Sequence, residues 1–419
     1  MREMKDSGVA WIGKIPSDWP LIRFKDKYSN IKEVAKERSV EYERLALTLK
    51  GVIKRPKDDS EGLQPKEFDD YQILRENDFV FKMIDLQNIS TSRVGLSPYT
   101  GLISPAYIRF APKEANQYNQ FVYYYLMSLY YNCVYNNLGG NGVRSALNGR
   151  DMGEFIIPYP NESEQRTISA FLDQKCSRVD TLIANVQTQI EKLKIYKKSL
   201  VIECITKGMH LYSNKKSTKI EWISELPAHW GECRIKNVIF PKDKPVLPTD
   251  QIITCFRDGE VTLRSKRRED GFTVSFTEHG YHGVDIGDLV VHGMDAFAGA
   301  IGCSDSRGKT TPVVHVCHTA GNNRYFMYYL RAMAYGNILM DLSNGVRIRS
   351  SDYRNFDRLG VFGIAVPPRT EQDEIVNFLD EKCSMIDSLI VSKQAKIEKL
   401  EQYKRSLIYE YVTGKKEVS

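Results

Sequence analysis

The chain has 419 residues, of which 42% are hydrophobic and 27% charged, and its formal net charge is +6. This apolar fraction suffices for two hydrophobic cores of ordinary domain size. The small net charge excludes a protein whose whole surface is basic, so any anion-binding surface must be local. The sequence predicts no membrane span and no secretory signal, and its cysteines, without a CxxC pair, are typical of a reduced, cytoplasmic protein.

The first segment, residues 1–160, opens with WIGKIPSDW (11–19) and is predicted to be a mixed α/β domain. Runs rich in β-branched and aromatic residues predict strands at 79–83 and 106–110, and NQFVYYYLMSLYYN predicts a helix with a broad apolar face. Basic residues gather around Gly51 in this segment; they are Lys50, Lys54, Arg55 and Lys57. The alternative interpretation of this cluster is a solvated loop without a partner.

Residues 161–212 predict a long spacer helix, whose regular part is FLDQKCSRVDTLIANVQTQIEKLKIYKKSLVIECIT (171–206). Apolar residues recur there at alternating steps of three and four, which is the pattern of a coiled-coil seam. The predicted seam residues are Val179, Ile183, Val186, Ile190, Leu193 and Leu200.

The third segment, residues 213–367, contains a diverged copy of the first, beginning with WISELPAHW (222–230). Strands are predicted at 288–293 and 312–316, and NRYFMYYLRAMAYGNI predicts a helix. A second basic cluster surrounds Gly259, at a similar place in the repeat; it comprises Arg257, Arg264, Lys266, Arg267 and Arg268.

Histidines crowd the same segment, together with one cysteine; they are His279, His282, His292, His315, Cys317 and His318. These side chains are zinc ligands only if the fold brings them together. Neighbours on a strand point to opposite faces, and the first segment has no equivalent cluster, so we expect no metal site. Base or phosphate contact by some of these histidines remains the functional alternative to ordinary surface or core positions.

The last segment, residues 368–419, predicts a second spacer helix, FLDEKCSMIDSLIVSKQAKIEKLEQYKRSLIYEYVT (378–413). Roughly 20 of about 36 positions are identical to the first helix, about 207 residues earlier. The seam continues in this copy at Ile386, Ile390, Ile397, Leu400 and Leu407.

The repeat predicts that the two helices pair with each other. If a pseudo-twofold axis relates the copies, the helices run antiparallel and the globular domains lie at opposite ends of a rod; parallel pairing, or pairing between two chains, stays open. The expected fold class is therefore α+β, with two mixed α/β domains separated by two long helices that form an intramolecular antiparallel coiled coil with pseudo-twofold symmetry.

The order of these motifs resembles that of specificity subunits of type I restriction-modification systems. The resemblance covers the whole chain: the two openings, the NGVR elements at 141–144 and 344–347, the Pro-x-x-x-Glu-Gln approaches at 160–165 and 367–372, and both helices. It implies that each globular half is a target recognition domain for one part of a split, asymmetric double-stranded DNA site. It also implies that the helices set the spacing and dock two modification (methyltransferase) subunits, and that restriction (translocase and nuclease) subunits join the complex.

The basic clusters fit this role, because Lys and Arg neutralise phosphates and Arg makes bidentate contacts with guanine edges. A second group of candidates follows the Asn-Gly turns, where arginines are presented just after a tight turn. These are Arg144, Arg347 and Arg349. Residues that differ between the halves are the candidate base readers, namely Gln87, Asn88, Ser145, Asn148, His292 and Ser350.

No catalytic residues are predicted. The one Pro-Pro pair follows Val366 rather than an acid or amide, and no HExxH, GxSxG or phosphate-loop context occurs. The resemblance places S-adenosylmethionine, ATP and magnesium on partner subunits and none on this chain. Two alternatives remain: a DNA-acting nuclease or methyltransferase with duplicated recognition domains, and a coiled-coil interaction protein that does not bind DNA.

Overall fold

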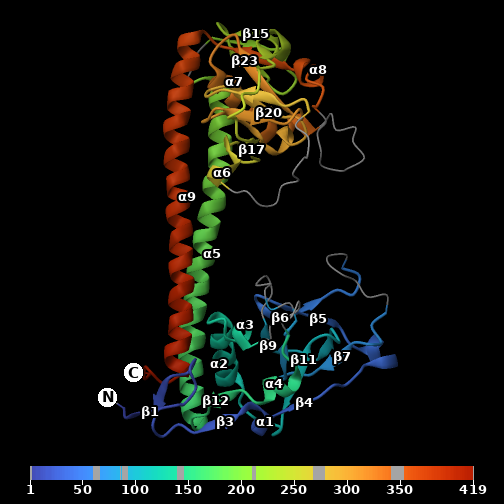
Figure 1. The fold of residues 1–419 in the computed structure, drawn as a ribbon, viewed down its shortest axis with the longest axis vertical. Helices are drawn as coiled ribbons and strands as arrows, with labels where there is room; N and C mark the ends of the chain where they lie inside the picture. The colour runs from blue at the N-terminus through green and yellow to red at the C-terminus, as the bar shows by residue number, and fades with distance from the viewer. Residues whose placement is uncertain are drawn as a thin grey trace. The chain divides into compact units, whose positions relative to one another are not determined.

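The computed structural model describes residues 2–59, 67–84, 86, 93–138, 146–209, 214–267, 279–340 and 353–418. The chain divides into two compact units (Figure 1). Unit 1 comprises Met1–Val186 and Ala395–Ser419, and unit 2 comprises Gln187–Gln394. Each unit therefore combines one globular region with a stretch of each long helix.

The two long helices are α5 (Glu162–Lys207) and α9 (Arg369–Val412), with 46 and 44 residues. Helix α5 begins well before the regular repeat, because Asn161 caps it: its Oδ1 accepts a hydrogen bond from the Glu164 backbone N–H at 3.0 Å. Glycines with positive φ follow both helices, Gly208 at 75° and Gly414 at 67°, which is the usual way to end a helix. Across the described residues, no helix is long and apolar enough to cross a bilayer.

Unit 1 contains two four-stranded sheets, ordered β6-β5-β10-β7 and β4-β11-β8-β9, and the pairs β1-β2 and β12-β3. Its elements are β1 (Met4–Asp6), β2 (Lys14–Pro16), β3 (Leu21–Arg23), α1 (Phe24–Lys27), β4 (Tyr28–Asn30), η1 (Lys36–Glu41), β5 (Arg44–Thr48), β6 (Gly51–Arg55), β7 (Gln72–Leu74), β8 (Phe79–Phe81), β9 (Val94–Leu96), β10 (Gly101–Ile103), β11 (Ile108–Pro112), α2 (Gln120–Tyr131), α3 (Val134–Leu138), α4 (Gly149–Gly153) and β12 (Ile156–Pro158).

Unit 2 has the sheet β16-β23-β20-β21 and the pairs β17-β18, β19-β22, β13-β14 and β15-β24. Its elements are β13 (Lys215–Ser217), β14 (Glu225–Pro227), β15 (Gly231–Arg234), η2 (Ile235–Asn237), β16 (Ile239–Pro241), β17 (Ile253–Cys255), β18 (Val261–Leu263), α6 (Arg264–Arg267), β19 (His282–Val284), β20 (Leu289–His292), η3 (Ala296–Ala298), β21 (Ile301–Cys303), β22 (Gly308–Thr310), β23 (Val314–Thr319), α7 (Asn323–Tyr335), η4 (Ile338–Met340), α8 (Asp357–Gly360) and β24 (Gly363–Val366).

The two units share one topology. The sheet β4-β11-β8-β9 of unit 1 matches β16-β23-β20-β21 of unit 2 strand for strand. The hairpin β5-β6 matches β17-β18, since β5 pairs in parallel with β10 and the residue before β17, Ile252, forms a parallel bridge to Lys309 of β22. The sequence repeat thus extends to the three-dimensional fold of the diverged parts.

Two predicted strands begin later than the sequence pattern indicates. The run 106–110 becomes β11 (Ile108–Pro112), because a turn in which Tyr107 N–H donates to Ser104 O occupies its first residues. The run 312–316 becomes β23 (Val314–Thr319) for the same reason, with Val314 N–H donating to Thr311 O. Residue propensity alone does not separate such a turn from the strand that follows it.

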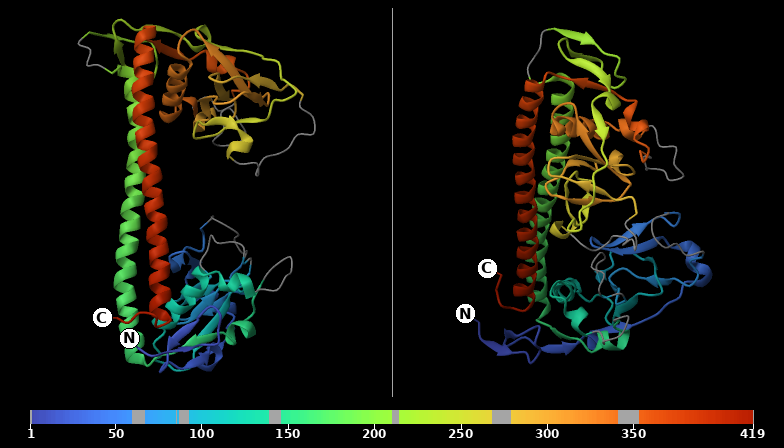
Figure 2. Two further views of the ribbon diagram at one scale, coloured as in Figure 1. Left: turned by 60° about the vertical axis from the view of Figure 1, so that its left-hand side comes forward. Right: turned by 45° about the horizontal axis from the view of Figure 1, so that its top comes forward.

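Each unit has a core that joins the globular region to both long helices. In unit 1, Trp19 packs in one cluster with Leu172 of α5 and Leu407 of α9. In unit 2, Trp230 packs in one cluster with Ile205 of α5 and Leu379 of α9. Figures 1 and 2 show the helix of each globular region, α2 or α7, beside these long helices.

The repeated Pro-x-x-x-Glu-Gln motif forms the junction at the start of each long helix. Gln165 Nε2 donates to Pro160 O at 2.8 Å, and Gln372 Nε2 donates to Pro367 O at 2.9 Å. Both glutamines are buried, so each amide compensates a backbone carbonyl that is removed from water. The motif is therefore a structural joint between the globular region and the helix.

A second repeated joint ties α2 and α7 to the long helices. The Tyr124 hydroxyl donates to Asp173 at 2.5 Å in unit 1, and the Tyr328 hydroxyl donates to Asp380 at 2.7 Å in unit 2. Gln120 and Arg324 donate to the same aspartates, at 3.1 and 2.6 Å. Both units thus use the same tyrosine–aspartate hydrogen bond, and they differ in the second donor to the aspartate, which is a glutamine in unit 1 and an arginine in unit 2.

Candidate nucleic-acid interface

The first basic cluster lies on the hairpin β5-β6 of unit 1. Thr48 pairs with Gly51, so residues 49 and 50 form the turn, and Gly51 has a φ of 90°. Thr48 Oγ1 donates to Gly51 O at 3.0 Å and accepts from the Lys50 backbone N–H at 3.1 Å. These bonds tighten the turn and leave Lys50 exposed at its tip.

The other cations lie on the second strand of this hairpin or in the turn after it, and they make ion pairs or carbonyl contacts there. Lys54 pairs with Glu43 across the strands at 2.5 Å, and this hydrogen bond raises the pKa of Lys54. Arg55 pairs with Asp59 at 2.5 Å, while Lys57 Nζ donates to Ser39 O at 2.7 Å. We therefore find an ordered row of cations, which holds positive charge at fixed positions along the strand.

The second basic cluster lies on the hairpin β17-β18 of unit 2 and on the single turn α6 that follows it. Phe256 N–H donates to Glu260 O at 2.8 Å, which closes a tip that contains Gly259 at a φ of 87°. Both basic clusters therefore occupy equivalent hairpins, each with a glycine in a conformation that other residues rarely adopt.

Arg257 of the unit 2 hairpin and Arg267 at the end of α6 also have carboxylate partners. Arg257, whose side chain is 68% exposed, pairs with Asp295 at 2.9 Å. Arg267 stacks over the Phe256 ring at 4.0 Å and pairs with Asp258 and Glu260, both at 2.7 Å; the Asp258 hydrogen bond raises the pKa of Arg267.

The remaining described cations of this cluster lie on α6. Lys266 donates to Ser306 Oγ at 2.7 Å and pairs with Asp305 at 3.4 Å. Arg264 Nε donates to Thr254 Oγ1 at 3.3 Å, and burial lowers the pKa of Arg264. Asp258, Glu260 and Asp305 are each more than half exposed, so their ion pairs are weak in water and a phosphate can replace them.

Several predicted contact residues lie outside the described residues. These are Arg144, Arg268, Arg347, Arg349, Gln87, Asn88, Ser145 and Ser350. Two predicted base readers are described, and each has a local structural role. Asn148 caps α4, with its side-chain oxygen accepting from Arg150 N–H and Asp151 N–H. His292 Nδ1 accepts from the Asp295 backbone N–H at 3.2 Å, and burial lowers the pKa of this imidazole.

The histidines of unit 2 are spread over several strands rather than gathered. His315 Nε2 lies 2.7 Å from Tyr353 O, His282 Nδ1 lies 3.2 Å from Asp243, and the His318 ring lies 5.2 Å from the Phe240 ring. Within the described part of the chain, no three His, Cys, Asp or Glu side chains are placed to hold a metal ion.

The predicted seam residues of the long helices are all buried or half-buried. In unit 1 they are Val179, Ile183, Val186, Ile397, Leu400 and Leu407, and in unit 2 they are Ile190, Leu193, Leu200, Ile386 and Ile390. In unit 1, Lys404 pairs with Asp180 at 2.7 Å. In unit 2, Lys197 pairs with Asp387 at 2.6 Å, and Lys393 Nζ donates to Gln189 at 2.6 Å.

Sequence reasoning missed the carboxylates that hold the hairpin cations and the tyrosine–aspartate joints. The joints had a signal, because Asp173 and Asp380 occupy the same place in both FLD motifs and a YY pair occurs in both apolar helices. The carboxylates had no such signal, since Glu43 and Asp295 reach the cations only through strand pairing and the fold of η3.

Comparison with known proteins gives one family match, two similar relatives and a similar fold. Residues 27–194 match the family described as the type I restriction modification DNA specificity domain. The type I restriction enzyme MjaVIII specificity subunit of Methanocaldococcus jannaschii is 23% identical, over 96% of this chain and 94% of its own length. A putative type I restriction enzyme MjaX specificity subunit from the same organism is also 23% identical, over 76% of this chain and 70% of its own.

A chain from a solved structure on assembly and conformational transition of the type I R-M system has a similar fold. Its TM-score is 0.65 at 13% sequence identity, over 95% of this chain and 98% of that one. At this identity the likeness concerns the fold alone, which is α+β with two long helices.

Proposed function

Since this chain belongs to the type I restriction-modification specificity family and is a DNA-recognition subunit, we propose that each unit reads one part of a split, asymmetric DNA site. The observation that carries the proposal is the pair of equivalent hairpins: one topology, a positive-φ glycine in each, and different cations around it. Equal scaffolds position two readers in the same way, whereas different side chains select different bases.

In this proposal residues 1–160 and 213–367 are target recognition domains, and residues 161–212 and 368–419 are spacer helices. Lys54, Lys266 and Arg267 neutralise phosphates first, because their carboxylate partners are exposed and easily replaced. The arginines after the Asn-Gly turns, Arg144, Arg347 and Arg349, belong to the same proposed interface.

The long helices are proposed to form an intramolecular antiparallel coiled coil. Three contacts support this. Asp180 with Lys404, Gln189 with Lys393, and Asp387 with Lys197 have partner numbers that run in opposite directions along the two helices. The two ion pairs also join repeat-equivalent residues in exchanged roles, which is the signature expected of a pseudo-twofold axis.

We propose further that the helices act as a fixed spacer between the two readers. Two modest readers on one rigid support gain affinity, because the second binding event is intramolecular, and they gain specificity for one separation of half-sites. Each helix of 46 or 44 residues provides the continuous backbone that such a spacer needs.

Assembly with restriction-modification subunits is a property of the family, and we propose that two modification subunits dock on the long helices. Exposed apolar side chains recur there at repeat-equivalent positions: Leu182 is 48% exposed and Leu389 51%, and Tyr196 is 57% exposed and Tyr403 52%. Paired exposure of this kind fits two copies of one partner. In this proposal, S-adenosylmethionine, ATP and magnesium bind to the modification and restriction subunits. The chain itself has no catalytic role. It works in the cytoplasm, in the same compartment as the DNA of the cell.

A direct test combines the purified chain, its modification subunits and a randomised duplex DNA library. We expect the complex to retain DNA with two fixed blocks of sequence, and the chain alone to show neither methyl transfer nor cleavage. Methyl transfer or cleavage by the chain alone would support the enzyme alternative. Retention of no sequence, with or without the partner subunits, would support a coiled-coil protein that does not bind DNA.

A further inference from the structure

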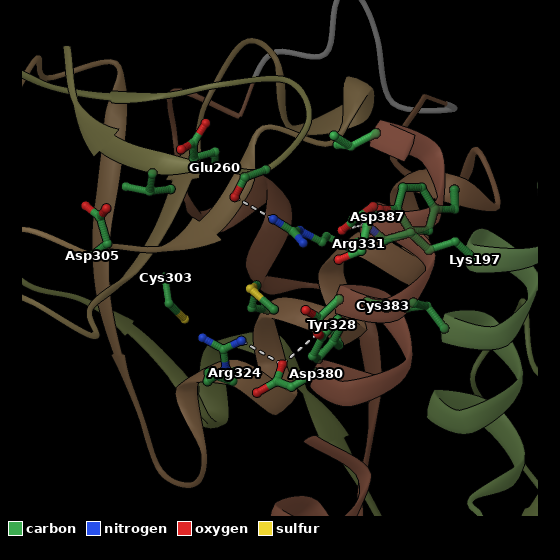
Figure 3. Close-up of a pocket in the computed structure, with 18 residues that line it drawn as sticks. Lys197, Glu260, Cys303, Asp305, Arg324, Tyr328, Arg331, Asp380, Cys383 and Asp387 are labelled. Atoms are coloured by element: carbon green, nitrogen blue, oxygen red, sulfur yellow. Dashed lines mark hydrogen bonds and ion pairs between the residues drawn. The ribbon is translucent and has the colours of Figure 1, made fainter. Parts of the chain in front are cut away.

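The tip of the unit 2 hairpin rests against α7, and a single arginine joins the two (Figure 3). We propose that Arg331 is a positioning residue, which holds the β17-β18 hairpin in the orientation that reads the second half-site. This inference rests on the proposed function of the hairpin and adds the residue on which its orientation depends.

Arg331 bridges two carbonyl groups that come from different elements. Its Nη2 donates to Gly259 O at the hairpin tip, and its Nε donates to Ile301 O, at the start of β21, at 2.7 Å. A guanidinium presents its donors in a rigid fork, so two simultaneous bonds fix both the distance and the angle between the tip and the sheet.

The hairpin tip is seated on glycines of the neighbouring segment. A Cβ on Gly302 would collide with the carbonyl oxygen of Gly259, and a Cβ on Gly299 would lie 2.9 Å from the carbonyl oxygen of Arg257. On the other side, a Cβ on Gly259 would occupy the position of the Arg331 guanidinium. The backbone of the tip is thus held between β21 and Arg331 at the closest approach that the chain allows.

The hydrogen bonds of Arg331 hold the hairpin tip in place, because side chains do not fill the space beside Arg331. A cavity of about 740 Å³ lies between the hairpin, α7 and the long helices of unit 2, and Arg331 lines it together with Glu260, Tyr335 and Ser388. Arg331 supplies the hydrogen bond from this side to the Gly259 carbonyl, so its removal takes that support from the tip.

The neighbouring arginine in the same cavity has a different task. Arg324 binds Asp380 of α9 at 2.6 Å together with Tyr328, as Figure 3 shows, and therefore ties α7 to the long helix. In unit 1 the equivalent position is Gln120, which binds the equivalent Asp173. Unit 1 thus forms the same joint with a glutamine, so we expect a glutamine at position 324 to preserve the joint in unit 2.

Unit 1 has no arginine at the place of Arg331. Three residues after the tyrosine of the joint, α2 carries Met127 where α7 carries Arg331. A thioether has no proton to donate, so this position of α2 provides no such brace among the described residues of unit 1. Its loss should therefore affect only one of the two half-sites.

The test uses the full complex with its modification subunits and compares Arg331→Met with Arg324→Gln. Met is the residue that unit 1 accepts at this place in the same helix, so the variant keeps α7 intact. The readout is methylation of two DNA libraries, each randomised in one half-site. A third variant, Arg257→Ala, identifies the half-site that unit 2 contacts.

We expect Arg331→Met to reduce the preference for the cognate bases roughly tenfold in the half-site that Arg257→Ala also affects, and to leave the other half-site unchanged. Arg331→Lys, which keeps a donor but not the fork, should lie between Arg331→Met and wild type. Arg324→Gln should match wild type in both libraries.

The inference would be overturned if Arg331→Met and Arg324→Gln showed the same preference for the cognate bases. It would also be overturned if Arg331→Met reduced this preference equally in both half-sites. The proposed function fails differently: in that case the wild-type complex itself would show no two-block preference, before any variant is compared. Assembly of each variant with the modification subunits, measured by size-exclusion chromatography, shows that the fold is preserved.

Discussion

At the scale of single residues, the two hairpin glycines share a backbone conformation but differ in their surroundings. Gly51 has a φ of 90° with no atom near its missing Cβ, whereas Gly259 has a φ of 87° and faces Arg331. Gly51→Ala should therefore cost about 1–3 kcal/mol of backbone strain. Gly259→Ala should cost the same strain and also displace the guanidinium.

We expect a larger fall in the unfolding midpoint for Gly259→Ala than for Gly51→Ala, measured by thermal denaturation of the full chain. The Gly51 variant is the control for strain alone. Equal midpoints in the two variants would mean that Arg331 adds nothing to the stability of the hairpin tip.

A buried carboxylate gives unit 2 a defined response to acid. Arg307 donates to both oxygens of Asp250, at 3.1 and 3.0 Å, and the Asp250 side chain is 2% exposed. The Arg307 hydrogen bonds lower the pKa of Asp250 below its ordinary 3.8. The resulting stabilisation is present above pH 3.8 and is lost as the pH falls through the lowered pKa.

Asp250→Asn should reduce the free energy of unfolding at pH 7 by about 1–3 kcal/mol, because Arg307 loses a charged partner. The difference between wild type and variant should shrink below pH 4. Thermal denaturation across pH 3–7 measures both effects, and a difference that stays constant over this range would contradict the assignment.

Some residues of the candidate site can be predicted from the sequence, and others cannot. Composition and repeat position predict the clusters around Gly51 and Gly259; among the described residues, the first lies on the hairpin β5-β6 and the turn after it, and the second on the hairpin β17-β18 and α6. The carboxylate partners Glu43 and Asp295 were not found, because they approach the cations through tertiary contacts that leave no local pattern.

At the scale of elements, the long helices carry a reciprocal charge pattern. Asp180 faces Lys404 in unit 1, and the repeat-equivalent Asp387 faces Lys197 in unit 2. Both pairs are partly exposed, so each contributes at most about 1 kcal/mol. In the proposed coiled coil we expect them to disfavour other registers, in which like charges would meet.

Asp180→Lys should lower the unfolding midpoint, because it places two ammonium groups together, and Asp180→Lys combined with Lys404→Asp should restore it. Thermal denaturation of the wild type, both single variants and the double variant gives the coupling energy of the pair. A double variant no more stable than the sum of the single changes would show that the charges do not set the pairing.

The elements were predictable where the sequence pattern is long and less so where it is short. The seam pattern located both long helices, but α5 begins earlier than the seam, at Glu162, since the cap at Asn161 and not the apolar period decides its start. The strands β11 and β23 were displaced by turns at their amino ends.

At the scale of the whole molecule, the repeat predicts how many partner subunits bind. Leu182 and Leu389 are exposed apolar residues at equivalent positions of the two helices. Leu182→Glu and Leu389→Glu should each remove one modification subunit, and the double variant should remove both, because a buried carboxylate without a partner is unfavourable. Native mass spectrometry of the complexes measures this number; unchanged stoichiometry in the double variant would exclude this surface.

The central claim is that two readers on one spacer recognise a split site, and mapping of methylated bases in DNA from cells that contain the complex tests it most directly. The wild type should give two fixed blocks separated by a constant unspecified spacer. A variant with seven residues inserted after Val186 and seven after Gln394 lengthens each helix by about 10 Å. It should keep both blocks and change the spacer by about three base pairs. A single continuous block in the wild type, or an unchanged spacer in the insertion variant, would contradict the account.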